Sequence, residues 1–209
     1  MKIAVVCANG KVGKLITAEA VNRGLDVTAV VRGENKTAAG KVMNKDLFDL
    51  TTEDLKGFDV VIDAFGAWTE DTLPMHSTSL AKLCDVLSGT DTRLLIVGGA
   101  GSLYVNPEHT ACVSDGPDFP DVFNPLAAAM AKALGELRER KDVKWTYISP
   151  AGDFQADGER SGEYILGGKE LTLNSKGESI ISYADYAIAM IDEAVSGNHI
   201  GQRISVVRK

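Results

Sequence analysis

The chain has 209 residues, 44% of them hydrophobic, and a formal net charge of −7 at pH 7. This length is enough for one sizeable core, so we expect a single domain over residues 1–209. The acidic balance, without any run rich in Lys or Arg, argues against nucleic acid or an anionic membrane surface as the main partner.

The cysteines and the first residues indicate where such a protein works. Cys7, Cys84 and Cys112 are far apart and include no Cys-x-x-Cys pair, so a disulfide framework is not expected. The first apolar run has six residues before an Asn-Gly pair, which is short for a secretory signal and for a membrane span. We therefore expect a cytoplasmic protein.

The stretch Ile3–Gly13 begins as an apolar strand and then changes to an apolar pattern of helical period. Gly10 lets the backbone approach a pyrophosphate, Gly13 lets the helix pack on the strand, and the helix N-terminus offers free N–H donors. The usual first glycine is missing, since Cys7 and Ala8 fill its place in the two common spacings. We predict a dinucleotide diphosphate site at Asn9, Gly10, Lys11, Val12 and Gly13.

The next predicted strand, Asp26–Arg32, ends on a cation about 20 residues beyond this turn. Folds that bind NAD usually place an acidic residue there, which holds the ribose 2′-hydroxyl. A guanidinium suits a 2′-phosphate instead, so Arg32 favours NADP, with NAD as the other nicotinamide cofactor. The alternative interpretation is a solvated surface arginine after an ordinary glycine turn.

Two further strand ends are suited to the cofactor. A short strand at Val42 and Met43 leads to Asp46 and Leu47, which either flank an adenine or belong to a simple loop. The apolar run 59–66 is typical of a buried parallel strand, and it ends in a glycine. We therefore expect the residues at its end to line the path of the cofactor: Phe65, Gly66, Ala67 and Trp68.

A helix is expected over about 72–87, followed by a strand, Arg93–Val97, and the glycine-rich segment Gly98–Ser102. So little side-chain bulk at a strand end leaves room for a ligand, at the edge where substrate and cofactor meet in a doubly wound sheet. We place Gly99 in the cofactor site and take Ser102 as the candidate catalytic residue. The irregular stretch Tyr104–Asn124 is expected to form a long loop over the site and is the candidate for a lid.

The remaining elements complete an α/β fold with a doubly wound parallel sheet. A helix over 125–140 precedes a strand, Lys144–Ile148, that leads to Ser149 and Pro150. Glycines then punctuate a small β-rich insertion on the substrate side, at about 152–182. Ser182 and Asp185 predict a capping box at the start of the last helix, and residues 202–207 form a final strand. His76, His109 and His199 have no partners at ligand spacing, so no metal site is expected.

Several segments, in the same order along the whole chain, resemble the bacterial NADH-flavin reductases. These belong to the atypical short-chain dehydrogenases, near the NmrA-like proteins and the flavin/biliverdin reductases. The segments are the glycine turn, Arg32, Asp63–Gly66, Gly98–Leu103, Trp145–Ala151 and Ile181–Ala187. The resemblance implies a Rossmann-like NAD(P)-binding fold, with FMN or FAD as a possible substrate.

The resemblance also implies roles for single residues. Ser102 resembles the serine beside the nicotinamide in the flavin/biliverdin reductases, and Ser149 and Pro150 resemble the segment near the carboxamide. Asp46 and Leu47 resemble the adenine flank, and Gly66 resembles the wall of the ribose and diphosphate. Lys132 is the candidate for the cofactor-site lysine of the carbonyl-reducing short-chain dehydrogenases, whose tyrosine comes four residues earlier; here that position is Ala128.

The absence of that tyrosine bears on the substrate. A ketone becomes an alkoxide on reduction and needs a positioned acid, which raises the reaction rate about 10²–10⁴-fold. A flavin or quinone delocalises the charge and takes its proton from water, so proximity and orientation suffice. The sequence thus favours a reductase that passes a hydride from NAD(P)H to a flavin or quinone, unless Tyr104 or Tyr147 replaces the acid.

The same residues bear on two other functions. An NmrA-like protein that senses NAD(P) without turnover fits the missing tyrosine equally well. An epimerase or dehydratase of nucleotide sugars is disfavoured by Ala128 and by the small C-terminal region. The sequence leaves the oligomeric state open.

Overall fold

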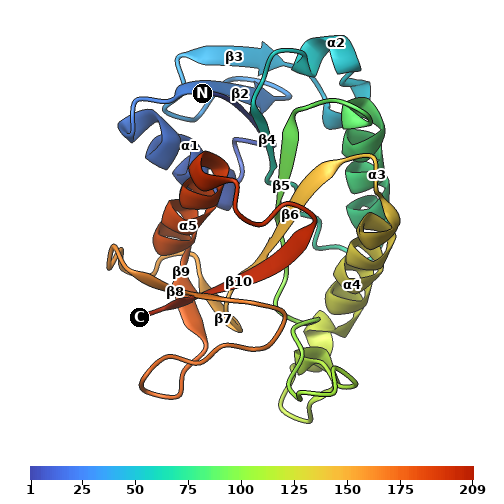
Figure 1. Ribbon diagram of the computed structural model, residues 1–209, viewed down its shortest axis with the longest axis vertical. Coiled ribbons are helices and arrows are strands. Elements are labelled where there is room, and N and C mark those ends of the chain that lie inside the picture. Colours follow the sequence, from blue (N-terminus) through green and yellow to red (C-terminus); the bar gives the residue numbers. More distant parts are fainter.

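Eight strands form one sheet, in the order β3-β2-β1-β4-β5-β6-β10-β8, in the computed structural model of residues 1–209 (Figure 1). All neighbouring strands are parallel except β10 and β8. Because β1 pairs with both β2 and β4, the strand order reverses at this point, and the carboxyl ends of β1 and β4 border a crevice. The strand bounds are β1 Lys2–Val6, β2 Asp26–Val31, β3 Lys41–Asn44, β4 Val60–Asp63, β5 Arg93–Val97, β6 Lys144–Ser149, β8 Tyr164–Gly167 and β10 Gln202–Arg208.

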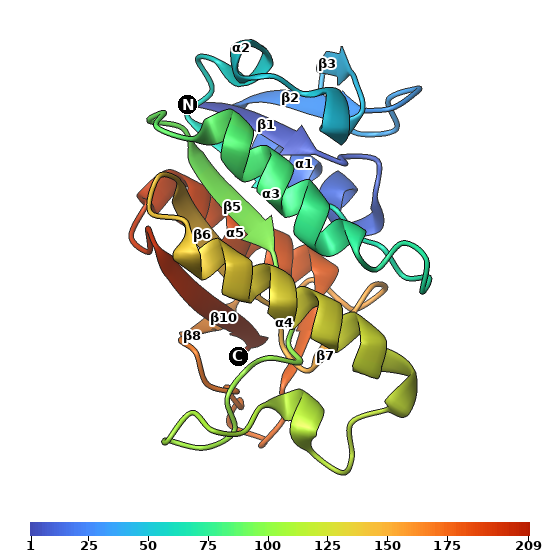
Figure 2. The ribbon, with the colours of Figure 1, turned by 90° about the vertical axis from the view of Figure 1, so that its right-hand side faces the viewer.

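Helices cover both faces of this sheet (Figure 2). Helices α1 (Lys11–Asn22) and α5 (Tyr183–Ser196) pack on one face, and α3 (Met75–Leu87) and α4 (Asn124–Glu139) on the other, with the short α2 (Thr52–Leu55) beside α3. Strand β1 is buried on both sides, because alternate residues enter the two cores. The predicted doubly wound α/β fold is confirmed.

The C-terminal insertion is β-rich, as predicted, but its strands separate. Strands β7 (Asp153–Gln155) and β9 (Ile180–Ser182) form a small parallel sheet of their own. Strand β8, which lies between them in the chain, instead extends the main sheet by pairing antiparallel with β10. The insertion is therefore continuous with the main sheet through β8.

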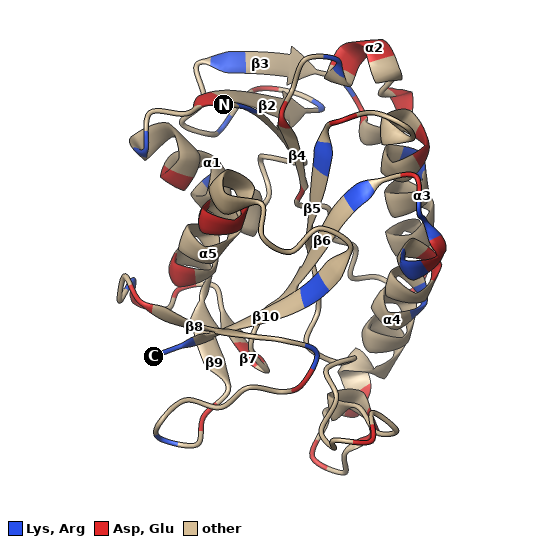
Figure 3. Cartoon of the chain, in the orientation of Figure 1, with Lys and Arg blue, Asp and Glu red and all other residues tan.

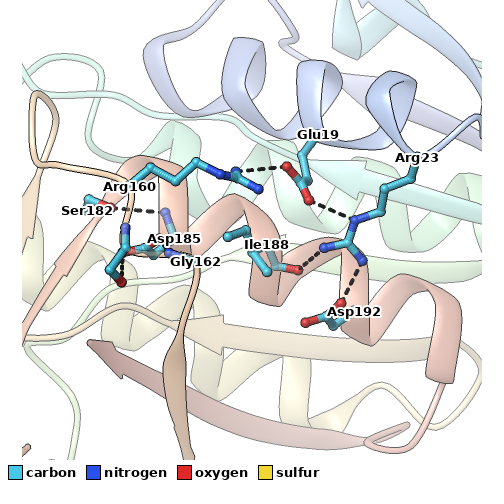
Figure 4. A network of polar contacts seen from close by, with 9 residues as sticks. Glu19, Arg23, Arg160, Gly162, Ser182, Asp185, Ile188 and Asp192 are labelled. Carbon is cyan, nitrogen blue, oxygen red and sulfur yellow. Dashed lines mark hydrogen bonds and ion pairs between the residues drawn. The ribbon is translucent and has the colours of Figure 1, made fainter. Parts of the chain in front are cut away.

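A polar network ties this insertion to α1 and α5 (Figure 4). The buried Glu19 carboxylate accepts hydrogen bonds from Arg23 at 2.7 Å and from Arg160 at 2.9 Å. Asp185 was predicted to complete a capping box with Ser182, but only half of the box forms: Ser182 accepts from the Asp185 N–H. The Asp185 carboxylate accepts instead from the backbone N–H of Ser161 and Gly162, and so it fixes the insertion.

The stretch 104–124 forms an irregular loop, as predicted, with two single 3₁₀ turns, Val113–Asp115 and Asp121–Phe123. A third such turn, Leu47–Asp49, follows β3. The long loop lies against the insertion, because the backbone N–H of Tyr104 donates to the Lys169 carbonyl and the backbone carbonyl of Tyr104 accepts from the Leu171 N–H. Its role as a lid stays a prediction.

In the cartoon of Figure 3, the positions of Lys and Arg are scattered along the chain among those of Asp and Glu. No helix has the length and apolar character that a membrane crossing requires.

Candidate functional site

A cavity of about 670 Å³ lies at the carboxyl edge of the sheet, where the strand order reverses. Ligands of open α/β sheets bind at such a switch point. Residues of four strand ends line it: Val6, Cys7, Asn9, Gly10, Val30, Val31, Arg32, Gly33, Lys45, Asp46, Leu47, Phe48, Ala64, Phe65, Gly66, Ala67, Trp68, Thr69, Thr72 and Met75.

The β1–α1 turn fits a diphosphate. Gly10 is the N-cap of α1, and no side chain occupies the free N–H groups of the first helical turn, which begins at Lys11 and Val12. A Cβ on Gly13 would lie 2.8 Å from the Cys7 carbonyl oxygen, so only glycine lets α1 approach the strand this closely. Asn9 and Gly10 line the cavity, whereas Gly13 is buried below it.

Cys7 occupies the place of the missing first glycine. Its φ is 58°, in the left-handed region that favours glycine, and its carbonyl accepts from the Gly10 N–H at 3.0 Å. Of the two positions that the sequence left open, Cys7 rather than Ala8 adopts this geometry. Burial raises the pKa of the Cys7 thiol to about 12, so the thiol is neutral at physiological pH.

Arg32 stands at the rim of the cavity, with its side chain 81% exposed. Its guanidinium lies 3.7 Å from Asp46, whose carboxylate also caps the next turn by accepting from the Phe48 N–H at 2.9 Å. Leu47, beside Asp46, is buried against the cavity wall. The structure therefore brings Arg32, Asp46 and Leu47 together at the end of the cavity expected for an adenosine.

The loop after β4 forms the opposite wall. Phe65, Gly66 and Ala67 line the cavity, and Trp68 stands over it with 70% of its surface exposed. His76 fixes this loop from α3, because its Nε2 lies 3.1 Å from the Ala67 carbonyl and its ring packs edge-on against Phe65. Phe65, Gly66 and Ala67 thus border the cavity, and their contact with a cofactor stays a prediction.

Asp63, at the end of β4, was not singled out from the sequence. It is 4% exposed, and its carboxylate accepts from the Phe65 N–H at 3.0 Å. Burial raises the pKa of Asp63 to about 6.

The segment after β5 is rich in glycine because it packs closely on its neighbours, and not because it leaves room for a ligand as predicted. A Cβ on Gly98 would overlap the Tyr147 ring, one on Gly99 would lie 2.9 Å from the Met130 sulfur, and one on Gly101 would lie 2.9 Å from Ala127. The glycines therefore let the segment pack on β6 and α4, and neighbouring side chains fill the space that the sequence suggested for a ligand. Gly99 does not line the large cavity.

Ser102 lies at the same edge, beside the end of β6, and a buried arginine holds it there. Arg203 donates from Nη1 to the Ser102 carbonyl at 2.7 Å, from Nη2 to Ser102 Oγ at 3.2 Å, and from Nε to Ser149 Oγ at 3.0 Å. Ser149 and Pro150 are both buried. Sequence reasoning missed Arg203; the available signal was a cation at the start of the predicted final strand, before Ile204.

Burial lowers the pKa of the Arg203 guanidinium to about 10, which leaves it charged at neutral pH. Tyr147 lies next to it in the sheet register and is also buried, and its hydroxyl accepts from the Gly99 N–H at 3.2 Å. Tyr104 stacks on His109 in the long loop. Tyr147 is thus packed beneath the glycine segment rather than presented at the surface.

Lys132 does not reach the site. The buried face of α4 carries Ala133, Leu134 and Leu137, so Lys132 points outward; its side chain is 70% exposed and lies 3.8 Å from Glu136. It borders a separate groove between α3 and α4. The placement of Lys132 in the cofactor site was wrong for this reason.

Comparisons with known proteins point the same way as the geometry. A family model described as NAD(P)H-binding matches residues 7–194. The protein YwnB of Bacillus subtilis (strain 168) is 42% identical over 210 residues, which cover 99% of this chain and 98% of YwnB.

Two solved structures are similar over nearly their whole length. One, from Streptococcus pneumoniae TIGR4 and described as a "putative NADH-flavin reductase", is 55% identical, with a TM-score of 0.98 and 100% of both chains covered. The other, from Bacteroides thetaiotaomicron and described as a "putative epimerase", is 35% identical, with a TM-score of 0.85; 99% of this chain and 96% of that chain are covered.

Proposed function

The chain belongs to the NAD(P)H-binding family, and from this premise we propose that it is a reductase that passes a hydride from NADPH to a flavin or quinone. The predicted resemblance to the NADH-flavin reductases is confirmed by the Streptococcus pneumoniae structure, which is 55% identical. That likeness supports an NAD(P)H-linked oxidoreductase; the choice of NADPH and of the acceptor is our proposal.

The observation that carries the proposal is the cavity at the strand-order switch, which the uncapped N-terminus of α1 borders at Gly10. The N–H groups of this turn would bind the diphosphate, and the helix dipole would add to the attraction. Arg32 would bind the 2′-phosphate at one end, and Phe65 and Gly66 would line the way to the other end. In this orientation the ends of β4, β5 and β6 would border the nicotinamide.

The choice of acceptor depends on whether a proton donor lies near the nicotinamide end of the site. Ala128 is exposed on α4, Lys132 points away, and Tyr147 is buried under Gly98. None of these positions presents an acid to an alkoxide, and Tyr104, the other candidate, stacks on His109 in the long loop. We therefore infer that reduction of a ketone lacks the acid that it needs. A conjugated acceptor that takes its proton from water needs only to be held against the nicotinamide, which supplies the hydride when bound.

Steady-state oxidation of NADPH, followed at 340 nm with FMN, FAD and a quinone in turn, tests this function. We expect turnover with at least one of these acceptors and a lower Kd for NADPH than for NADH by fluorescence titration. Tight binding of NADPH without turnover by any acceptor would contradict the reductase and would support an NmrA-like sensor instead.

A further inference from the structure

Arg203 is the unusual charged group at the acceptor end of the site. Its residue is 4% exposed, and its three hydrogen bonds all go to oxygens of Ser102 and Ser149, none of them a carboxylate. A buried guanidinium without an anion is costly, because it has lost hydration and has gained no opposite charge. Arg93, which is only partly buried, by contrast pairs with Glu193 at 2.8 Å.

The hydrogen bonds of Arg203 also fix what Ser102 can do. A guanidinium has only donors, so Ser102 Oγ accepts from it and the serine hydroxyl hydrogen must point elsewhere. Ser102 is partly exposed, so a molecule at this edge can take that hydrogen bond. The positive charge behind the oxygen makes the hydroxyl a stronger donor.

We propose that Arg203 is a positioning residue: it holds the Ser102 hydroxyl as a hydrogen-bond donor to the acceptor and stabilises the negative charge that the acceptor gains. This inference rests on the proposed reductase function. In carbonyl-reducing short-chain dehydrogenases a tyrosine and a lysine stabilise the reduced substrate. In this chain a serine and a buried arginine would perform part of that role.

The charge balance of the reaction shows at which step the acceptor carries a negative charge that needs stabilisation. NADPH is oxidised to NADP⁺ by the loss of a hydride, and a neutral quinone that gains this hydride becomes a quinol anion. Water then supplies the proton that completes the quinol. The negative charge therefore exists between the two steps, and a fixed donor and a nearby cation lower the free energy of the state that carries it.

The test compares the binding of two quinones of similar shape in the presence of saturating NADP⁺. One is 2-hydroxy-1,4-naphthoquinone, which is an anion at neutral pH, and the other is the neutral 2-methyl-1,4-naphthoquinone. Absorption titration gives both Kd values. In Arg203→Gln we expect the anion to bind about 10- to 100-fold more weakly, the range for a lost charge-assisted hydrogen bond, and the neutral quinone to change less than about 3-fold.

Further variants separate positioning from folding. Arg203→Lys keeps the charge and should restore part of the preference for the anion, and Ser102→Ala should lose the preference as Arg203→Gln does. Arg208→Gln removes another arginine from the same strand and should leave both Kd values unchanged. If Arg203→Gln does not fold, Ser102→Ala and Arg203→Lys decide the question by the same two titrations.

Equal losses for both quinones in these variants would overturn the inference and show that Arg203 only holds the loop. That result would leave the reductase function intact as long as the wild-type protein oxidises NADPH with a quinone. Absence of oxidation by the wild-type protein would instead contradict the proposed function itself.

Discussion

The two ends of the candidate site are built differently. The adenosine and diphosphate end is an open cavity, whose turn, Arg32 and Asp46 follow β1, β2 and β3 in chain order. At the acceptor end the backbone segments pack closely on one another, and Arg203 joins two serines that lie 101 and 54 residues away in the chain. The first end depends on local backbone geometry, and the second depends on contacts between distant segments.

The largest effect should come from the turn at the open end. Gly13→Val puts branched carbons against the Cys7 and Ala8 carbonyl oxygens, which already lie within 2.9 Å of a single added Cβ. We expect a loss of about 3 kcal/mol in the free energy of unfolding, the upper part of the range for overpacking, together with loss of NADPH binding. Urea unfolding and fluorescence titration measure the two effects.

A matched glycine serves as the control. Gly135 lies inside α4, where an added Cβ would meet nothing within 4 Å. Gly135→Ala should therefore stabilise the protein by about 0.5–1 kcal/mol through helix propensity and leave binding unchanged. A Gly13 variant as stable as the wild type would contradict the proposed need for close packing.

Asp63, which lies between the two ends, should show the next largest effect. Its pKa is raised to about 6 from an ordinary value of 3.8, so the unfolded chain ionises first, and this carboxyl destabilises the fold as the pH rises from about 4 to 6. At pH 8, Asp63→Asn should remove a penalty of roughly 2–3 kcal/mol that is absent at pH 4. Unfolding at both pH values measures it.

Asp71→Asn changes an exposed carboxylate nearby and provides the control for this measurement. The stability difference between Asp71→Asn and the wild type should be nearly the same at pH 4 and pH 8. If Asp63→Asn showed no more dependence on pH than this control, the proposed burial penalty would be wrong.

Arg32→Glu tests cofactor choice at the open end. It replaces a charge-assisted contact to the 2′-phosphate by repulsion, so the Kd for NADPH should rise about 30-fold and that for NADH only a few-fold. Fluorescence titration with both cofactors gives the ratio. An equal loss for the two cofactors would support the alternative of a surface arginine and remove the preference for NADP.

The smallest effect is expected at Cys7. Because φ is 58° there, Cys7→Gly should relieve about 1 kcal/mol of backbone strain, offset in part by the loss of the thiol packing, while Cys7→Val should destabilise the turn. Thermal unfolding of the two variants gives their order. A valine variant more stable than the glycine variant would contradict the backbone conformation described for this turn.

The difference between the two ends also explains what the sequence could predict. The glycines of the β1–α1 turn, Arg32 and the end of β4 are recognisable because each lies directly after a strand with a clear apolar pattern. The parallel strands of the main sheet follow from the same alternation of strands and helices. Strand β8 was missed as part of this sheet because its partner β10 comes much later in the chain.

The acceptor end could not be predicted in the same way. The direction of the Lys132 side chain depends on which face of α4 is buried. The segment after β5 is rich in glycine because Tyr147, Met130 and Ala127 pack against it. The role of Arg203 depends on Ser102 and Ser149 meeting in space. Local spacing contains none of this information.

The most direct test of the account is a crystal structure of the protein soaked with NADP⁺. We predict the diphosphate on the backbone N–H groups at Gly10–Gly13, the 2′-phosphate at Arg32 and the nicotinamide beside the ends of β5 and β6. A structure with the N-terminus of α1 free of ligand and NADP⁺ bound elsewhere, for example between α3 and α4, would contradict it.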